Sequence, residues 1–393
     1  MRFMFTLSVL MMILITPVCW AAQDNHVPQL LEKYLQDHQK DELISGIVAS
    51  ISAPHEKIQT YVAGTVSKDN NADPMIKNNM FQIGSITKSY TAAIILLLEQ
   101  EGKLNINQTV GEWLPKYTKW KKVTIKQLLN MTSGIPGYLS SPKLEAIFTK
   151  DIKKQWSDKE IVDIVYENAG TTKAYNYSDT NYLILGMIIE EVARNTYTGE
   201  INKRLINKYH LNQTLYYVEP YSKSLLDIQP RGYYYGKSTG SIKYGDDVTD
   251  TNLSVGGPAG AILATTEDVI HWVRLLFSGA VLAEKQQKEL QDVISMKTGK
   301  PIKSATADDR FGFGLGVVQG YNPELGKYWY YEGDTIGHRA IYMWVPCNDI
   351  IISIALNSSP FVDENVKDHA GDLLMEIYHA VAASDKKHAC VAK

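Results

Sequence analysis

The chain has little cysteine and no excess of positive charge. Its 393 residues include only three cysteines, none at a spacing typical of a zinc site. Lysine and arginine number 40 against 43 acidic residues, which gives a net charge of −3, and there is no basic stripe or lysine-rich tail. This composition argues against nucleic acid as a partner. Nothing in the sequence implies a bound metal or an organic cofactor.

Long apolar runs are absent except at the start of the chain. Arg2 supplies a short positive region, Phe3 to Val18 form an apolar core, and Cys19-Trp20-Ala21 places small residues where a signal peptidase reads them. The pattern predicts a signal peptide, residues 1–21, and an exported chain that is periplasmic or secreted. An uncleaved anchor and lipidation of Cys19 are weaker alternatives, because the run is short for a bilayer and the lipidation context is poor. We expect no stable membrane span after signal removal.

Two cysteines remain once the signal peptide is removed, Cys347 and Cys390. Export would place them in an oxidising compartment, where a disulfide tying the C-terminal tail to the sheet can form. Two free thiols are the alternative, and the sequence leaves both open. Neither cysteine has a histidine nearby in the sequence, so neither is predicted to be a nucleophile.

Hydrophobic spacing predicts strands near both ends of the chain and mostly helices between them. The predicted helices are Val27 to His38, Ile86 to Gln100, Val123 to Tyr138, Thr180 to Arg194, Thr266 to Ser278 and residues 366–383. The predicted strands are Gly46 to Ser52, Lys57 to Val66 and four runs between residues 311 and 357. We therefore expect one mixed sheet built from both ends of the chain, with a helical region inserted.

Ser85 and Lys88 form the first candidate pair of catalytic residues. They lie in the stretch FQIGSITKSY, where a loop meets a predicted long helix. Residues three apart share one face of a helix, so both side chains point the same way. A serine hydroxyl needs a base before it acts as a nucleophile, and a lysine desolvated in a pocket can help to remove the proton. The backbone N–H of Ser85 at the helix start is also available to a developing oxyanion.

The stretch AYNYSDTNYLILG supplies a second candidate group. Tyr177 and Asp179 lie two residues apart, just before the predicted helix Thr180 to Arg194. Side chains at this spacing in a loop can both project into one cleft. There Tyr177 can relay a proton between Ser85, Lys88 and a leaving group.

At this point the sequence resembles the serine hydrolases that include class C β-lactamases, serine D-alanyl-D-alanine carboxypeptidases and related esterases. The resemblance covers about residues 40–360. FQIGSITKSYTA, LEQEGKLNINQTVGEWLP, TIKQLLNMTSGIPGY, YNYSDTNYLILGMIIEEV and GGPAGAILATTEDVIHW all resemble blocks of that family in the right order. Ordered blocks are far more specific than any single Ser-x-x-Lys match.

The resemblance implies an α+β fold of the β-lactamase/transpeptidase type, with an antiparallel sheet flanked by helices and an inserted, mostly helical region. It implies one catalytic domain, residues 22–393, whose sheet part is about 22–84 and 255–393 and whose helical part is about 85–254. It also implies that Ser85 is the acylated nucleophile and that Lys88 and Tyr177 are the acid–base pair. The family usually has Asn where this chain has Asp179.

The family's third motif lies on a strand beside the cleft, and two segments compete for it. Lys297-Thr298-Gly299 has the usual letters, but a helix-like run precedes it and a polar loop follows it. Tyr331-Glu332-Gly333 lacks the letters but ends a predicted strand. We favour the second segment, in which Tyr331 and Gly333 border the cleft and the backbone N–H of Asp334 is the second oxyanion donor.

This choice weakens the expected recognition of a substrate carboxylate. Tyr331 is neutral where the family has a lysine or a histidine, and Glu332 adds negative charge beside it. Asp179 replaces an amide that can donate, because an ionised carboxylate only accepts. Asp179 is instead placed to pair with Lys88 and hold it protonated, which would move the role of base towards Tyr177. Arg339 is a candidate to compensate for the missing charge.

The sequence therefore predicts an exported serine hydrolase that acts through an acyl-enzyme on a peptide, an amide or an ester. Its expected partners are small-molecule or peptide substrates, including a peptidoglycan stem peptide or a β-lactam. We rank a D-alanyl-D-alanine carboxypeptidase first and an esterase close behind, with a β-lactamase as a further alternative. A non-catalytic protein that binds wall peptides is the alternative from another class.

Overall fold

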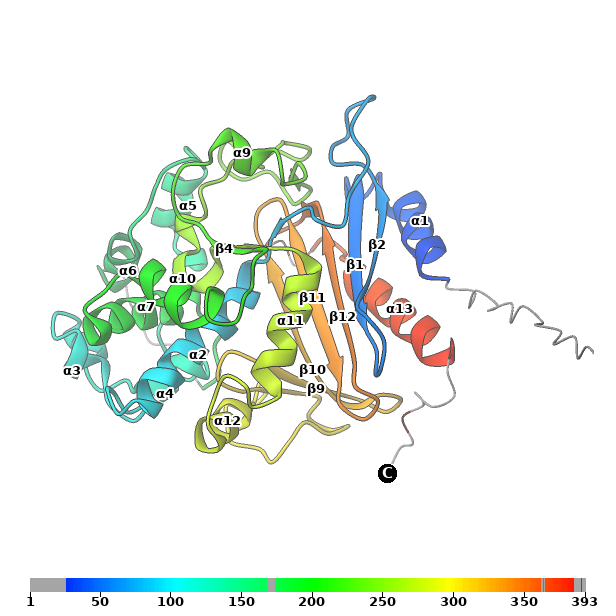
Figure 1. The fold of residues 1–393 in the computed structure, drawn as a ribbon. Helices are drawn as coiled ribbons and strands as arrows, with labels where there is room; N and C mark the ends of the chain where they lie inside the picture. The colour runs from blue at the N-terminus through cyan, green and yellow to red at the C-terminus, as the bar shows by residue number, and fades with distance from the viewer. Residues whose placement is uncertain (1–25, 168–173, 362, 364, 385–389, 391–393) are drawn as a thin grey trace, which may run out of the picture.

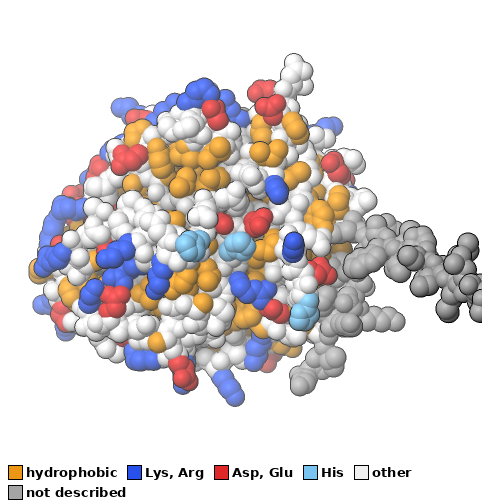
Figure 2. All heavy atoms as spheres, viewed as in Figure 1, with side chains coloured by type: hydrophobic (Ala, Val, Ile, Leu, Met, Phe, Trp, Pro, Cys, Tyr) orange, Lys and Arg blue, Asp and Glu red, His pale blue; other side chains and the backbone are white. Residues whose placement is uncertain are grey.

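A computed structural model describes residues 26–167, 174–361, 363, 365–384 and 390. The predicted signal peptide lies outside the described residues. No helix within the described part of the chain is long and apolar enough to cross a bilayer. Side chains of both charge signs are interspersed over the face drawn in Figure 2, in keeping with the small net charge.

The core of the fold is an eight-stranded sheet with the strand order β2-β1-β12-β11-β10-β9-β8-β7. Its strands are β1 (Gly46–Ser52), β2 (Gln59–Gly64), β7 (Ile294–Ser295), β8 (Phe311–Phe313), β9 (Val318–Asn322), β10 (Gly326–Asp334), β11 (Arg339–Val345) and β12 (Ile350–Leu356). Every neighbouring pair is antiparallel. The two ends of the chain meet where β1 pairs with β12, as predicted, but the expectation of a mixed sheet is wrong. Short turns join β1 to β2 and join the successive strands from β8 to β12, and such turns connect antiparallel neighbours.

Helices cover both faces of this sheet (Figure 1). Helices α1 (Val27–His38) and α13 (Ala370–Ser384) pack on one face, and α11 (Thr266–Phe277) packs on the other. Successive side chains of β1 point to opposite faces of the sheet, and both faces are covered by an apolar core. Ile47, Ala49 and Ile51 join the core under α1 and α13, while Val48 joins the core on the opposite face. A strand buried on both sides reads as one continuous apolar run, which GIVASIS nearly is.

A mostly helical region lies beside the sheet, on the left in Figure 1. Helix α2 (Thr87–Gln100) leads into this region. The other helices of the region are α3 (Val110–Trp113), α4 (Ile125–Leu129), α5 (Pro142–Phe148), α6 (Asp158–Glu167), α7 (Asp179–Ala193), α8 (Tyr197–Ile201), α9 (Lys223–Leu226) and α10 (Gly257–Gly260). Helix α12 (Glu284–Gln291) lies outside the region. Short strands complete the architecture: β3 (Phe81–Gln82), β4 (Thr214–Tyr216) and β6 (Ile262–Ala264) form one small sheet, and β5 (Tyr233–Tyr234) and β13 (Ser358–Ser359) form another.

Helices α2 and α7 are the two central helices of the molecule, and each is buried on almost every side. This explains why their sequences are apolar on more than one face. The stretch Val123 to Tyr138 was predicted as a helix closed by Ser-Gly and Pro-Gly turns, and the structure has this order. Only Ile125–Leu129 is helical there, because Gly134, Pro136 and Gly137 follow within a few residues and favour turns.

Of the two possibilities left open for the late cysteines, a disulfide and two free thiols, the structure has the disulfide. Cys347 and Cys390 are bridged, with their Cα atoms 5.7 Å apart, inside the range usual for this bond. Cys347 lies between β11 and β12, so the bridge ties the segment after α13 to the sheet.

Candidate active site

Ser85 lies in the 3-10 turn Gly84–Ile86, which continues directly into α2. Gly84 before it has a φ of +47°, and a Cβ atom at this position would come within 2.8 Å of backbone atoms of Asp334. Only glycine accepts this backbone at such a close approach. Glycine at position 84 therefore allows the turn that contains Ser85 to pack directly against the end of strand β10.

Lys88 is fully buried one turn further along, and its Nζ atom contacts three oxygen atoms. It lies 2.8 Å from Ser85 Oγ, 2.9 Å from the carbonyl oxygen of Ala259 and 2.6 Å from Asp179 Oδ1. Burial lowers the pKa of Lys88, and the negative charge of Asp179 opposes part of that shift. The predicted ion pair between Lys88 and Asp179 is present, and Asp179 raises the pKa of Lys88 as expected, but desolvation has the larger effect and the net pKa is lowered.

Tyr177 comes from the loop before α7 and reaches the same place. Its phenol forms hydrogen bonds with Ser85 and, at 3.3 Å between hydroxyl oxygens, with Tyr331. Lys88 Nζ lies 5.0 Å from the centre of its ring. Although 39% of the residue is exposed to the cleft, burial around the phenol and the charge of Asp179 raise the pKa of Tyr177 well above its usual value. Tyr177 is therefore a neutral hydroxyl at neutral pH.

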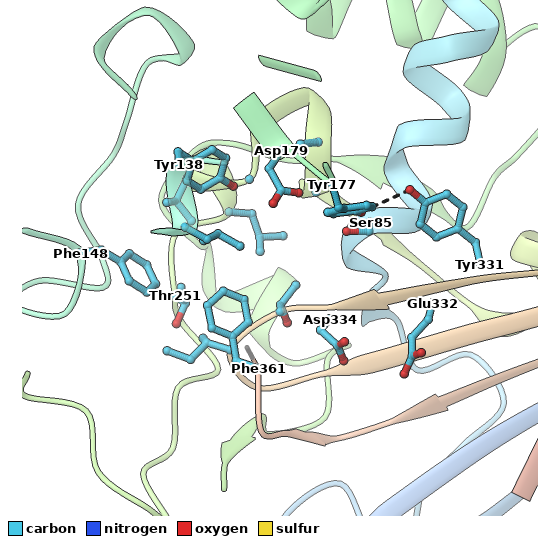
Figure 3. A pocket seen from close by; sticks show the side chains of 18 of the residues that line it. Ser85, Tyr138, Phe148, Tyr177, Asp179, Thr251, Tyr331, Glu332, Asp334 and Phe361 are labelled. Carbon is cyan, nitrogen blue, oxygen red and sulfur yellow. Dashed lines mark hydrogen bonds between the residues drawn. The ribbon is translucent and has the colours of Figure 1, made fainter. Parts of the chain in front are cut away.

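Asp179 is the first residue of α7, where the helix N-terminus favours a negative charge. Figure 3 shows its carboxyl facing the same cavity as Ser85 and Tyr177. The structure thus brings Ser85, Lys88, Tyr177 and Asp179 together from two elements that lie about 90 residues apart in the sequence.

Strand β10 closes the other side of the nucleophile. A Cβ atom on Gly333 would lie 2.8 Å from the backbone nitrogen of Ser85 and still closer to the carbonyl oxygen of Ile83, so only glycine fits there. Tyr331 on the same side of the strand is buried, and its hydroxyl meets that of Tyr177 (Figure 3). The backbone of Asp334 runs against Gly84, beside the N–H of Ser85.

Lys297, Thr298 and Gly299 lie in a turn after the short strand β7, not on a strand beside the cleft. None of the three borders the cavity that contains Ser85. Gly299 has a φ of +68°, and its backbone packs against Ala174 and Tyr175 at the start of the Tyr177 loop. The segment Tyr331 to Gly333 has the strand position that the third motif requires.

The cavity next to Ser85 has a volume of about 370 Å³ and a wall that sequence reasoning missed. Its apolar lining includes Leu139, Leu144, Phe148, Leu253, Val255 and Phe361. These residues come from short helices and loops between residues 139 and 361, and no spacing pattern links them. Among the residues that line the cavity there is no lysine, arginine or histidine, while Asp179, Glu332 and Asp334 all border it.

Arg339 does not supply the missing positive charge. It is 1% exposed, and its guanidinium donates to Glu42 at 2.7 Å, to Asp368 at 2.5 Å and to the carbonyl oxygen of Ser358 at 2.8 Å. Arg339 is the first residue of β11, and its side chain is part of the packing between the sheet, the segment after α1 and the segment before α13. The prediction that it compensates in the cleft is wrong.

Comparison with known proteins identifies the family and the fold. A family model described as Beta-lactamase matches residues 31–375. Penicillin-binding protein 4* of Bacillus subtilis is 26% identical over 279 residues, which cover 68% of this chain and 58% of that protein. The chain thus spans less than two thirds of the length of this relative.

Two solved structures share the fold. A D-amino acid amidase from Ochrobactrum anthropi, complexed with D-phenylalanine, superposes with a TM-score of 0.78 at 21% identity, covering 92% of this chain and 99% of that one. A D-stereospecific amidohydrolase from Streptomyces gives a TM-score of 0.72 at 23% identity, covering 89% of this chain and 96% of that one.

Proposed function

The chain belongs to the beta-lactamase family, and from this premise we propose that it is an exported serine hydrolase that forms an acyl-enzyme on Ser85. The observation that carries the proposal is the 2.8 Å contact between Lys88 Nζ and Ser85 Oγ at the wall of a cavity that Tyr177 shares. The substrate is a small molecule or a peptide with an acyl group on nitrogen or oxygen.

Lys88 is suited to be the base in acylation. A neutral amine keeps two N–H donors and one lone pair, and the three neighbours of Nζ match that set. In that neutral form the carbonyl oxygen of Ala259 and the carboxylate of Asp179 accept the two N–H bonds, which leaves the lone pair for the hydroxyl of Ser85, 2.8 Å away. The lowered pKa of Lys88 makes this neutral form accessible. We therefore assign the role of base to Lys88 within the predicted pair of Lys88 and Tyr177.

In the proposed reaction Ser85 Oγ bonds to the acyl carbon while its proton passes to Lys88. The N–H groups of Ser85 and Asp334 stabilise the oxyanion, and each such donor typically contributes roughly a hundredfold or more in rate. Tyr177, whose raised pKa keeps it protonated, gives a proton to the leaving group as the carbon–leaving-group bond breaks. The proton on Lys88 then passes to Tyr177 and restores its phenol. A water molecule hydrolyses the ester bond between Ser85 and the acyl group, which releases the acid and restores the hydroxyl of Ser85.

The lining of the cavity supports substrates without a carboxylate over anionic ones. Both β-lactams and D-alanyl peptides present a carboxylate, and no basic side chain lines the cavity to receive it. We therefore place esters and amides without a free carboxylate ahead of D-alanyl peptides and β-lactams, which reverses the order that the sequence favoured.

Covalent labelling tests the proposal. A fluorophosphonate should add its mass once to the protein, and peptide mapping should place it on Ser85. Ser85→Ala should abolish the label, while Ser140→Ala, a change at an exposed serine nearby, should leave it unchanged. Labelling that persists in Ser85→Ala would reject the assignment. A folded native protein that takes no label from any acyl reagent would favour the binding protein instead.

A further inference from the structure

Met131 follows helix α4 with a backbone conformation that is usual for glycine. The helix ends in a Schellman motif, in which the N–H of Thr132 bonds to the carbonyl oxygen of Gln127 at 3.0 Å. The N–H of Met131 bonds to the carbonyl oxygen of Leu128 at 3.4 Å, and the φ of Met131 is +64°. Glycine is common at this position of the motif because a Cβ atom is unfavourable in the left-handed region. A methionine held in this conformation is therefore expected to contribute through its side chain.

The side chain of Met131 is fully buried and contacts the segment that carries Tyr177. Its Sδ atom accepts a hydrogen bond from the backbone N–H of Ser178 at 3.3 Å and another from Asn181 Nδ2 at 3.6 Å. Asn181 Oδ1 accepts from Ser133 Oγ at 2.7 Å, so the nitrogen of the same amide is turned towards the sulfur. Ser178 is fully buried, and its N–H therefore needs an acceptor within the protein.

The backbone of Met131 holds the same segment on the other side of Tyr177. Its carbonyl oxygen accepts from the N–H of Asn176 at 2.9 Å. Met131 thus bonds to the peptide groups immediately before and after Tyr177, one through its carbonyl oxygen and one through its sulfur. The phenol of Tyr177 has to meet Ser85 and Tyr331. A side chain whose two flanking peptide groups are fixed has less freedom to leave such a position.

We propose that Met131 positions Tyr177 for proton transfer to the leaving group, and that its sulfur, as a hydrogen-bond acceptor, is what this role requires. The inference rests on the proposed function, in which Tyr177 is the acid. Met131 does not line the cavity that contains Ser85, so it acts through Tyr177 and is a positioning residue.

The proposal is tested with ethyl butanoate and p-nitrophenyl butanoate, which give the same acyl-enzyme from a poor and a good leaving group. Met131→Leu keeps an apolar side chain of similar volume but removes the acceptor. It should reduce kcat/KM about ten- to a hundredfold on the ethyl ester, because a poor leaving group depends most on a well-placed acid. On the p-nitrophenyl ester the loss should be less than about threefold, since this leaving group needs little protonation.

Two further substitutions at the same position make the test independent of one variant. Met131→Gln returns an acceptor at a similar reach and should restore most of the rate on the ethyl ester. Met131→Gly suits the backbone of the turn but has no acceptor, so it should show the same selective loss as Met131→Leu.

Met343→Leu is the matched control, because Met343 is buried in the core under α1 and α13. It should leave the ratio of the two ester rates unchanged. In a Tyr177→Phe background Met131→Leu should not change this ratio further, since the two residues act as one unit. A ratio that is equal in the native protein and in Met131→Leu, or one that Met343→Leu changes as much, overturns the proposal.

Hydrogen exchange separates this proposal from the proposed function. The amide of Ser178 should exchange slowly in the native protein and in Met343→Leu, and at least about tenfold faster in Met131→Leu. Such a change in exchange, in a protein that hydrolyses neither ester and takes no label on Ser85, would reject the hydrolase and keep Met131 as the residue that holds the Tyr177 segment. Hydrolysis that depends on Ser85, with exchange and rate ratio unchanged in Met131→Leu, would do the reverse.

Discussion

At the residue scale, Lys88 is the point where three elements meet. Its Nζ atom contacts Ser85 at the start of α2, Asp179 at the start of α7 and Ala259 in α10. Desolvation lowers the pKa of Lys88 and Asp179 raises it again in part. The departure from the family's usual asparagine therefore acts on Lys88, the base in the proposed reaction.

Asp179→Asn should move the acid limb of the pH–kcat/KM profile to lower pH by at least about one unit, since an opposite charge within hydrogen-bond distance shifts a pKa by roughly one to three units. The sign follows from Lys88 acting as a neutral amine. Removing the carboxylate lowers the pKa of Lys88 further, so the neutral form persists to lower pH. Profiles of the native and mutant proteins on one ester measure the shift. An acid limb that stays in place or moves upwards would contradict the role of Lys88 as base.

At the element scale, the turn at Lys297 to Gly299 supports the site from behind. It does not border the cavity, but it packs on Ala174 and Tyr175, just before Tyr177. The turn therefore has the Lys-Thr-Gly sequence of the family's third motif, but its contacts are with the loop that carries Tyr177 and not with the cavity.

Gly299→Ala should slow acylation of Ser85 several-fold and reduce the free energy of unfolding by about 1–3 kcal/mol. The new Cβ atom would lie 2.7 Å from the backbone nitrogen of Tyr175, at a φ of +68°. Gly279→Ala is a matched control, because Gly279 has a φ of +78° but nothing lies within 4 Å of the new atom. Labelling rates and denaturant unfolding measure both effects. Equal labelling rates in the two variants would show that the turn does not position Tyr177.

Some helices, strands and site residues could be predicted from the sequence, and others could not. Helix Val27–His38 and strand Gly46–Ser52 were predicted with their observed bounds, because their apolar spacing is regular and uninterrupted. Ser85, Lys88 and Tyr177 were found from short local patterns that resemble a family. The apolar cavity wall was not predictable, since Phe148, Leu253 and Phe361 become neighbours only through tertiary packing. Arg339 was misplaced for a related reason: a strand pattern does not say which buried carboxylates a side chain will meet.

At the scale of the whole molecule, both ends of the chain are fastened to the sheet face opposite α11. Helices α1 and α13 share one apolar core there, and the disulfide joins Cys390 to Cys347 between β11 and β12. The candidate active site lies at the other side of the sheet, between β10 and the helical region. The division of residues 22–393 into a sheet part and a helical part stays a prediction.

Replacing both Cys347 and Cys390 by serine should lower the free energy of unfolding by about 2–4 kcal/mol, as expected for a loop closed over 43 residues. Labelling of Ser85 at 25 °C should be unchanged, because the bridge does not border the cavity. Denaturant titration with and without a reductant measures the effect. The native protein should become as unstable as the double variant once reduced, and an unchanged midpoint would show that the bridge contributes nothing.

The pairing of β1 with β12 has a consequence for how the molecule is made. Ile47 lies opposite Leu356, so the partner of the first strand is synthesised some 300 residues later. Strand β2 follows within a few residues and covers one edge of β1, but the other edge stays open until β12 is made, and such edges recruit neighbouring chains. Because contacts this distant in sequence form slowly, the yield of native protein is set by how well the waiting strand is shielded while the rest of the polypeptide emerges.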